Sequence, residues 1–290
     1  MTAVSLTAET IIGEIKRCVA DSPDNTLGSE TGEPAWAEPL VGFAAGDDQL
    51  FTTFKRDIGA YYWTPHEIYR MSVPCLAARP AELSVISWIL PQTAKTKSDH
   101  RRCRTYPSGR WTRTRHFGEA FNLRLAEHLV TFLTQSGAVA VAPVLSPRWQ
   151  ITTEHPSGFA SNWSERHAAH VAGLGTFGLC DGLITPVGKA VRIGSVIARM
   201  RLSATPRPYR SHTEWCLHYA NGKCQSCIKR CPVGAISKLG HDKRRCSDYV
   251  LKKMLYYTKK RFNLPVYSCG LCQVAVPCES GIPAGITGKT

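Results

Sequence analysis

The stretch CQSCIKRCPVGAI, which runs from Cys224 to Ile236, decides how this sequence folds. Its three cysteines are spaced Cys-x2-Cys-x3-Cys, and Pro232 follows the last of them. A tight Cys-x2-Cys turn places two thiolates side by side, whereas the cysteine before the proline leaves that turn and binds elsewhere. We therefore predict that this stretch holds a metal centre through cysteine sulfur.

Further cysteines extend this motif in both directions. The bacterial ferredoxin pattern is Cys-x2-Cys-x2-Cys-x3-Cys-Pro, and here Asn221 stands at its first cysteine while Cys216 lies five residues earlier. A second Cys-x2-Cys pair follows, but the cysteine expected just before Pro277 is displaced to position 278. The eight candidate ligands are Cys216, Cys224, Cys227, Cys231, Cys246, Cys269, Cys272 and Cys278.

Eight thiolates supply two [4Fe–4S] cubes with none to spare, because each iron of a cube needs one terminal ligand. One predicted ligand set is Cys216, Cys224, Cys227 and Cys278. The other is Cys231, Cys246, Cys269 and Cys272. Two cubes in one module store and transfer single electrons, so we expect the substrate chemistry in the remaining part of the chain.

Two other uses of clustered cysteines match less well. Zinc sites also contain Cys-x2-Cys pairs, but a following Pro-Val-Gly-Ala-Ile turn is unusual for them. A zinc site is the alternative to iron–sulfur clusters. Disulfide frameworks belong to short exported chains, and Met1–Thr10 of these 290 residues lacks the features of a signal peptide. The remaining cysteines are predicted to be small buried hydrophobic residues or inert thiols: Cys18, Cys75, Cys103 and Cys180.

The composition describes a folded, basic protein. Hydrophobic residues make up 43% of the chain, which excludes a wholly disordered protein. No stretch of about 18 apolar residues occurs, so we expect no membrane-spanning helix and a cytoplasmic location. The net charge of +14 indicates an anionic partner. The basic runs at 95–115 and 201–261 could bind an RNA backbone, with Tyr106 and Trp111 stacking on bases, or could be solvated faces near anionic clusters.

The chain divides near Pro206 and Pro208, where cysteine and basic residues become frequent. Before that point, periodicity predicts helices over 8–20, 118–136 and 163–172. Strands are predicted at 40–45, 83–90 and 138–144, and over 183–197 around a turn. Residues 21–39, 91–115 and 145–160 are predicted to be loops. We therefore predict one domain at residues 1–205 and a second at 206–290.

Several motifs together resemble the epoxyqueuosine reductase family, from about residue 40 to 280. AGLGTFG at 172–178, preceded by Glu165-Arg166, is similar to that family's "ER…AGLGWIGK". LITP at 183–186 is similar to its "LL-I-x-P", and VGFA at 41–44 to its N-terminal "VGFA". CQSCIKRCPVGAI, the RRC ending at Cys246 and CGLCQ at 269–273 resemble its "CxxCxxxCPTGAI", "ARRC" and "GCDDCQ".

The resemblance implies an α+β fold: a nitroreductase-like cobalamin-binding domain followed by a ferredoxin-like domain with two [4Fe–4S] clusters. It further implies that a low-potential donor of the ferredoxin or flavodoxin type feeds electrons to cobalt, as in the related reductive dehalogenases. A substrate then loses an oxygen or another leaving group. The cofactor-binding candidates are Arg166, Gly173, Gly175, Thr176 and Gly178.

The sequence departs from the family at the proton donor. Phe159 stands where the family has an aspartate, seven residues before the arginine of its "ER" motif. Glu165 is a weak catalytic candidate, which requires that burial raise its pKa; the ordinary interpretation is an ion pair with Arg166 or a charge at the N-terminus of a helix. The family's tRNA-binding C-terminal helical repeats are also missing from this sequence. A different substrate is therefore expected; the alternatives are a true tRNA epoxyqueuosine reductase and a non-catalytic electron carrier.

Two other motifs have ordinary interpretations. Gly173-x-Gly175-x-x-Gly178 matches the dinucleotide fingerprint, but a helix rather than a strand precedes it, and Arg192 lies where an acid belongs. A glycine turn lying against a corrin is the preferred interpretation. His167 and His170 share a helix face and could be metal ligands, one of them to cobalt, although such pairs are more often polar contacts.

Overall fold

The computed structural model describes residues 6–153, 155–156 and 158–286. Its centre is a four-stranded antiparallel sheet in the order β1-β2-β8-β3. These strands are β1 (Leu40–Ala45), β2 (Ser84–Pro91), β8 (Val191–Ala198) and β3 (Ala140–Val141). β2 pairs with β8 along its whole length, from Ser84 opposite Ala198 to Pro91 opposite Val191. Every residue of β2 is buried, because both faces of the sheet are covered.

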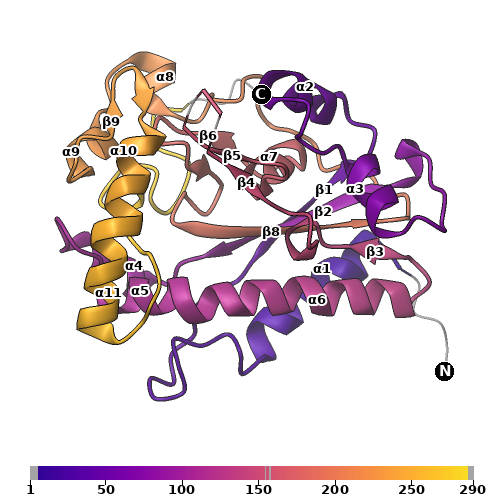
Figure 1. Cartoon of the computed structure of the whole chain (residues 1–290), viewed down its shortest axis with the longest axis horizontal. Coiled ribbons are helices and arrows are strands. Elements are labelled where there is room, and N and C mark those ends of the chain that lie inside the picture. Colours follow the sequence, from indigo (N-terminus) through magenta and orange to yellow (C-terminus); the bar gives the residue numbers. More distant parts are fainter. Residues whose placement is uncertain (1–5, 154, 157, 287–290) are drawn as a thin grey trace.

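Helices cover the two faces of this sheet and give the chain a mixed α/β fold (Figure 1). α1 (Ala8–Asp21) and α6 (Glu119–Gln135) lie on one face, with a core that includes Ile11, Trp88 and Leu129. α2 (Gln49–Ile58), α3 (Pro65–Ser72) and α7 (Glu165–Val171) lie on the other, around Trp163. Short elements complete the first two hundred residues: η1 (Pro80–Glu82), α4 (Ala94–Arg101), α5 (Gly109–Arg113), the π-helical turn η2 (Thr114–Gly118), η3 (Pro143–Leu145), β4 (Ile151–Thr152), β5 (Ala160–Ser161), β6 (Thr176–Phe177) and β7 (Leu183–Ile184).

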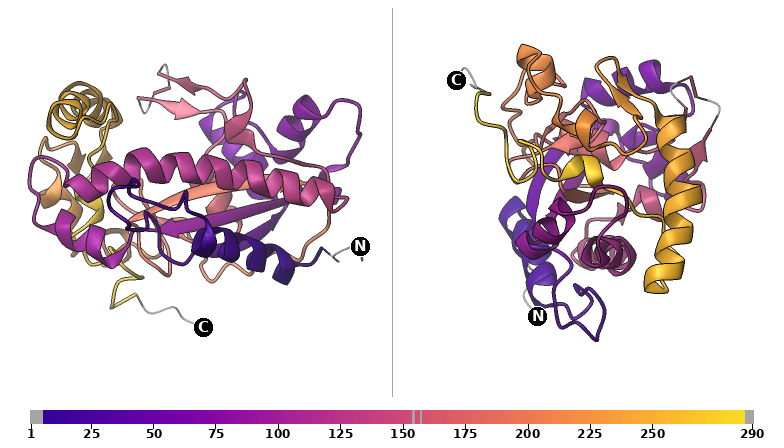
Figure 2. Two further views of the ribbon diagram at one scale, coloured as in Figure 1. Left: turned by 90° about the horizontal axis from the view of Figure 1, so that it is seen from below. Right: turned by 90° about the vertical axis from the view of Figure 1, so that its left-hand side faces the viewer.

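The cysteine-rich part of the chain gathers at one end of the sheet, at the left of Figure 1 and facing the viewer in the right view of Figure 2. A third core unites Trp215 and Ile236 of this part with Leu179 and Ile184 of the first. The predicted boundary at residue 205 therefore coincides with a change of composition, while packing continues across it. The elements of this part are α8 (Leu217–Asn221), α9 (Ser226–Arg230), β9 (Ile236–Ser237), β10 (Gly240–His241), α10 (Lys243–Asp248), the π-helical turn η4 (Tyr249–Met254), α11 (Leu255–Phe262) and η5 (Leu271–Gln273).

Strongly periodic segments fold as their sequences predict, and polar ones do not. Thr7 caps α1, and Gly137 follows α6 with a φ of +92°. The predicted loop at 91–115 is wrong, because Thr93 and Ser108 cap two short helices there, α4 and α5. Their polar composition hides the helical pattern. The predicted loop at 145–160 contains the small β4–β5 pair, and the strand predicted over 138–144 shortens to two residues.

No helix within the described residues is long and apolar enough to cross a membrane. The expected lack of an export signal concerns residues 1–10, of which 1–5 lie outside the described part of the chain.

Gly194 in the middle of β8 gives a stability prediction. A Cβ there would overlap the buried indole of Trp88, whose Nε1 donates to Asn122 Oδ1 at 2.9 Å. We expect Gly194→Ala to lower the free energy of unfolding by about 1–3 kcal/mol, the usual cost of overpacking a core. Gly13→Ala is the matched control: its Cβ would meet nothing within 4 Å on α1, so it should stabilise by roughly 0.5–1 kcal/mol. Urea unfolding measures both, and an unchanged Gly194→Ala midpoint would contradict this packing.

Candidate functional site

Four of the predicted ligands line one small cavity: Cys216, Cys224, Cys227 and Cys278. Cys216 begins α8 and Cys227 lies in α9, so two short helices and the C-terminal segment meet here. Cys278 is buried, and burial raises the pKa of its thiol. Cys216 and Cys278, the two cysteines displaced from the usual spacing, thus lie with the two in regular positions. These four are the residues assigned to one cube; their role as ligands stays a prediction.

The second predicted set gathers around Cys269. Burial, together with the negative charges of Cys246 and Cys231, raises the pKa of the Cys269 thiol to about 11. Cys231 Sγ accepts the Ala235 backbone N–H at 3.2 Å, because the Cys-Pro-Val-Gly-Ala loop folds back over its own sulfur. Cys272 completes this set, and its strongest sulfur contact is with Cys180. Within the described residues, no three Cys, His, Asp or Glu side chains converge at the spacing of a single metal ion.

Cys180 makes a contact that its place in the sequence does not reveal. It is buried, but it is not an isolated hydrophobic residue, because Lys189 Nζ donates to its sulfur at 3.2 Å. Hydrogen bonds with Cys227 and Cys272 hold the pKa of the Cys180 thiol well below its usual range. Burial opposes the charge of Lys189, but the neighbouring thiolates outweigh it and raise the pKa of that ammonium. No spacing pattern could have revealed this group, since its members come from separate segments.

The other three extra cysteines lie apart from this group. Cys18 and Cys103 are half-buried, and burial raises the pKa of both thiols. Cys75 is exposed, which excludes a small buried residue and leaves the other prediction, an inert thiol.

The glycine-rich segment joins the two parts of the chain. Gly173 has a φ of +78°, and a Cβ there would lie 2.7 Å from the Pro206 carbonyl oxygen. A Cβ on Gly175 would overlap the Ile184 carbonyl, and Gly178 also faces Ile184. Thr176 Oγ1 accepts the Trp215 backbone N–H at 3.0 Å. The chain's own backbone therefore explains these glycines, and their contact with a corrin stays a prediction.

Arg166 extends this junction. Its guanidinium donates to the Asp181 carbonyl at 2.6 Å, rather than pairing with Glu165. The Asp181 side chain in turn contacts His241 Nδ1 at 3.0 Å. Burial lowers the pKa of His241, but hydrogen bonds to Asp181 and Cys246 outweigh it and raise that pKa to about 10. A protonated imidazole thus lies beside a member of the second cysteine set.

His167 and His170 are both engaged in the fold. His170 Nδ1 lies 2.7 Å from the Gly175 carbonyl, and its ring stacks on Tyr209. His167 Nδ1 lies 2.8 Å from Ser164 Oγ, with its ring against Phe54. Burial lowers the pKa of His167 to about 3, so this imidazole is neutral at pH 7. Structural polar contacts account for the pair.

Glu165 lies in an enclosed polar site on the face of the sheet that α7 covers. Burial raises the pKa of its carboxyl to about 8, against the opposing effects of Ser195 and Arg192. Neither Glu165 oxygen has a hydrogen-bond partner of normal geometry among the described residues, and the same holds for Arg192 Nε and Tyr62 Oη. Glu119 accepts from both Arg192 and Arg115, and Arg115 also donates to Tyr267 at 2.6 Å. The site therefore combines a protonated carboxyl with unused polar atoms.

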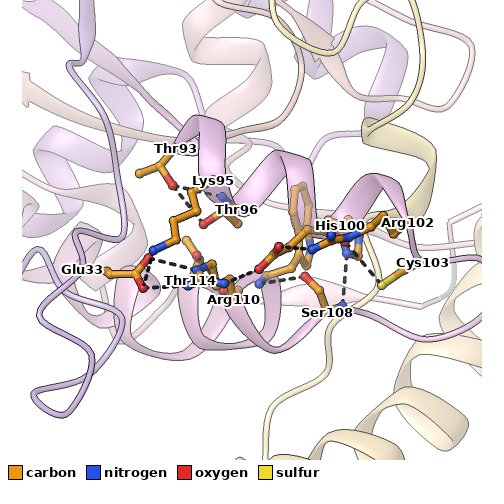
Figure 3. Close-up of polar contacts among 12 residues, drawn as sticks. Glu33, Thr93, Lys95, Thr96, His100, Arg102, Cys103, Ser108, Arg110 and Thr114 are labelled. Atoms are coloured by element: carbon orange, nitrogen blue, oxygen red, sulfur yellow. Dashed lines mark hydrogen bonds and ion pairs between the residues drawn. The ribbon is translucent and has the colours of Figure 1, made fainter.

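The basic run at 95–115 is largely neutralised within the molecule (Figure 3). Arg110 pairs with Glu33 and Asp99, and Lys95 contacts Glu33 at 3.1 Å. Arg101 reaches the buried Glu279 of the C-terminal segment at 2.5 Å. The Arg101 contact holds the run against the cysteine-rich part, and the other contacts pair its charges with Glu33 and Asp99 of the first part.

The proposed base-stacking aromatics of this run are also engaged. Trp111 is buried and stacks on His100 at 4.2 Å, so the expectation that it stacks on RNA bases is wrong. Tyr106 is 45% exposed, but one face of its ring stacks on Tyr257 at 4.2 Å.

Comparison with known proteins supports the resemblance seen in the motifs. No protein-family model matches the sequence. Epoxyqueuosine reductase of Francisella cf. novicida (strain Fx1) is 31% identical over 125 residues, which are 41% of this chain and 33% of that protein. The chain thus spans about a third of the curated relative that it matches.

Solved structures share the fold. One is an epoxyqueuosine reductase with an epoxyqueuosine-modified tRNA stem loop (TM-score 0.50, 17% identity, 96% of this chain and 67% of that one). Another is a reductive dehalogenase whose description concerns B12-dependent dehalogenation (TM-score 0.52, 13% identity, 95% and 37%). The predicted likeness to epoxyqueuosine reductase is confirmed, as is a mixed α/β fold of this kind. The division into nitroreductase-like and ferredoxin-like domains stays a prediction.

Proposed function

We propose that this chain is an oxidoreductase of the epoxyqueuosine reductase type, in which two [4Fe–4S] clusters deliver electrons to a cobalamin. The observation that carries the proposal is the meeting of Cys216, Cys224, Cys227 and Cys278 around one cavity. Two of these cysteines lie outside the usual spacing, and a shared cluster would explain why all four line the same space. Free cysteines in this number also suit the reducing cytoplasm.

The residues present fit the clusters, and polar atoms beside α7 suit the amide groups of a corrinoid. Thiols with N–H donors nearby, as at the half-buried Cys231, are the usual surroundings of cubes. Unused polar atoms at Glu165, Arg192 and Tyr62 could bind the amide groups of a corrinoid. When bound, low-valent cobalt supplies a two-electron reductant. Arg166 and the glycine segment then keep the cluster region joined to that site through Asp181 and His241.

Glu165 is our candidate for the group that gives a proton to the substrate. Its raised pKa, about 8, means that the carboxyl carries a proton at neutral pH. Burial excludes water from it, and no basic side chain forms an ion pair with it among the described residues. This would compensate for Phe159, which cannot donate a proton in place of the family's aspartate. The leaving group on the substrate would be an oxygen or a halogen.

Anaerobic reconstitution tests the proposal. The purified chain, loaded with iron and sulfide, should bind about eight irons and show [4Fe–4S] signals on reduction. Added cobalamin should then change its absorbance under a low-potential donor such as reduced flavodoxin. Bound iron without a change in cobalamin absorbance would favour the alternative of a non-catalytic electron carrier. Bound zinc, or no metal at all, would contradict the proposal.

A true tRNA epoxyqueuosine reductase is the second candidate, and one surface favours it. α10, η4 and α11 form a continuous exposed helix on the outside of the cysteine-rich part (Figure 1). Lys253, Lys259 and Arg261 are exposed on it, and Tyr256 is 67% exposed with Lys260 above its ring. Basic side chains beside a free aromatic ring suit a single-stranded RNA loop.

Binding of a tRNA anticodon stem loop separates the two candidates. If RNA binds here, Lys253→Glu with Lys259→Glu should weaken binding at least tenfold and reduce its salt dependence, because two phosphate contacts are lost. Fluorescence anisotropy at two salt concentrations measures both quantities. The control is Lys95→Glu, since Lys95 lies in the neutralised run. Equal affinity of all variants would leave the basic helix to an acidic electron donor.

A further inference from the structure

A buried lysine–cysteine pair lies between the two sets of predicted cluster ligands. Lys189 is 3% exposed and Cys180 is 6% exposed. Lys189 Nζ donates to Cys180 Sγ at 3.2 Å. Cys180 also packs in the third core with Cys227 of one set, and Cys272 of the other set packs against the same core. Cys180 therefore shares a core with predicted ligands of both clusters.

The cluster framework does not need either residue as a ligand. Eight other thiols already supply two cubes, so a ninth sulfur at their junction has no iron left to bind. A buried ammonium is costly unless anionic groups surround it. Here Lys189 lines the same cavity as Cys216, Cys227 and Cys278, so its ammonium lies among predicted thiolate ligands. The Lys189 backbone N–H also donates to the Cys278 carbonyl at 2.9 Å, which fixes the lysine against the cavity. The fold thus holds a permanent positive charge beside both ligand sets.

We propose that Lys189 and Cys180 form an inter-cluster element that sets the reduction potentials of the two clusters. The inference rests on the proposed function, because it requires the clusters to be present. Hydrogen bonds and positive charge at ligand sulfurs stabilise the reduced cluster, which carries one more negative charge, and so raise its potential. Lys189 would supply the positive charge, and Cys180, whose sulfur accepts the Lys189 N–H, would hold that charge beside Cys227 and Cys272. Both are positioning residues that act through Cys227 and Cys272.

Potential measurements on matched variants test this role. The variants are Lys189→Met, Lys189→Arg, Cys180→Ala and Cys180→Ser, with Cys18→Ala as the control because Cys18 lies in the α1–α6 core. Each is reconstituted anaerobically, assayed for iron per chain and titrated by electron paramagnetic resonance. We expect Lys189→Met and Cys180→Ala to keep their iron and to shift at least one midpoint negative. A tenfold change in the reduction equilibrium corresponds to about 59 mV for one electron. Lys189→Arg and Cys180→Ser should retain part of the wild-type potential, and the control all of it.

Three results would overturn the inference. Unchanged midpoints in clusters with full iron content would show that the pair has no influence, and would leave the proposed function intact. Loss of about half the iron in Cys180→Ala would make Cys180 a ligand instead. A wild-type chain without clusters would defeat this inference together with the proposed function. If Lys189→Met does not fold, the two Cys180 variants still decide the outcome.

Discussion

Replacing Cys278 with alanine should remove one cluster and leave the other. The iron content should fall from about eight to about four atoms per chain, because a cube that loses one of its four thiolates is no longer held stably. Cys278 lies in the cavity with Cys216, Cys224 and Cys227, and none of the second set lines that cavity. Cys216→Ala should have the same effect. Iron and sulfide analysis after anaerobic reconstitution, together with the spectrum of the reduced protein, measures the loss.

The comparison with other cysteines makes this result specific. Cys269→Ala should remove the other half of the iron, and Cys278→Ala combined with Cys269→Ala nearly all of it. Cys75→Ala should change nothing, because Cys75 is exposed and lies outside both sets. Full iron content in both Cys216→Ala and Cys278→Ala would show that the cavity does not hold a cluster. Retention in Cys216→Ala alone would place the first ligand elsewhere.

Replacing Glu165 with glutamine should nearly abolish turnover. Loss of a positioned proton donor typically costs a factor of about 10² to 10⁴ in rate. In the wild-type protein, activity that needs the protonated carboxyl should fall as the pH rises through about 8, and the variant should lack this decline. The assay uses reduced viologen with an epoxyqueuosine-modified stem loop and with a bromophenol, so that either leaving group is detected. Glu127→Gln on the exposed face of α6 is the control.

Stability provides a second measurement of Glu165 that needs no substrate. Its folded pKa lies above the ordinary value of 4.5, so the neutral carboxyl stabilises the fold fully below about pH 4.5. This contribution is lost as the pH rises toward about 8, where the carboxyl ionises in its buried site. Glu165→Gln cannot ionise. The free energy of unfolding of the variant, relative to that of the wild type, should therefore rise by about 3–5 kcal/mol between pH 5 and pH 8. Thermal unfolding across this pH range measures the difference. Midpoints of the two proteins that change in parallel with pH would contradict a buried, protonated Glu165.

Local periodicity and short cysteine spacing predict part of this structure correctly without knowledge of the fold. The stripes of Ile11 and Ile15 in α1, and of Leu125 and Leu129 in α6, are buried as their spacing predicts. The mostly apolar run of β2 becomes the strand whose residues are all buried. The short Cys-x2-Cys spacing likewise places Cys224 and Cys227 beside one cavity, while the grouping of four cysteines as ligands of one cluster stays a prediction. Such features persist because neighbours along the chain impose them.

Ion pairs, hydrogen bonds and burial that involve distant segments become visible in the folded chain alone. The pairing of Lys189 with Cys180, and of Arg101 with Glu279, joins residues that no local pattern connects. The sequence allowed the basic run at 95–115 to bind RNA, but in the structure Glu33 and Glu279 from other segments, together with Asp99 of the run, pair with its arginines. Burial likewise sets the pKa of Glu165, because desolvation depends on everything packed around the carboxyl. The sequence shows which ionisable side chains are present. Their partners and their burial, and therefore their pKa values, depend on the folded surroundings.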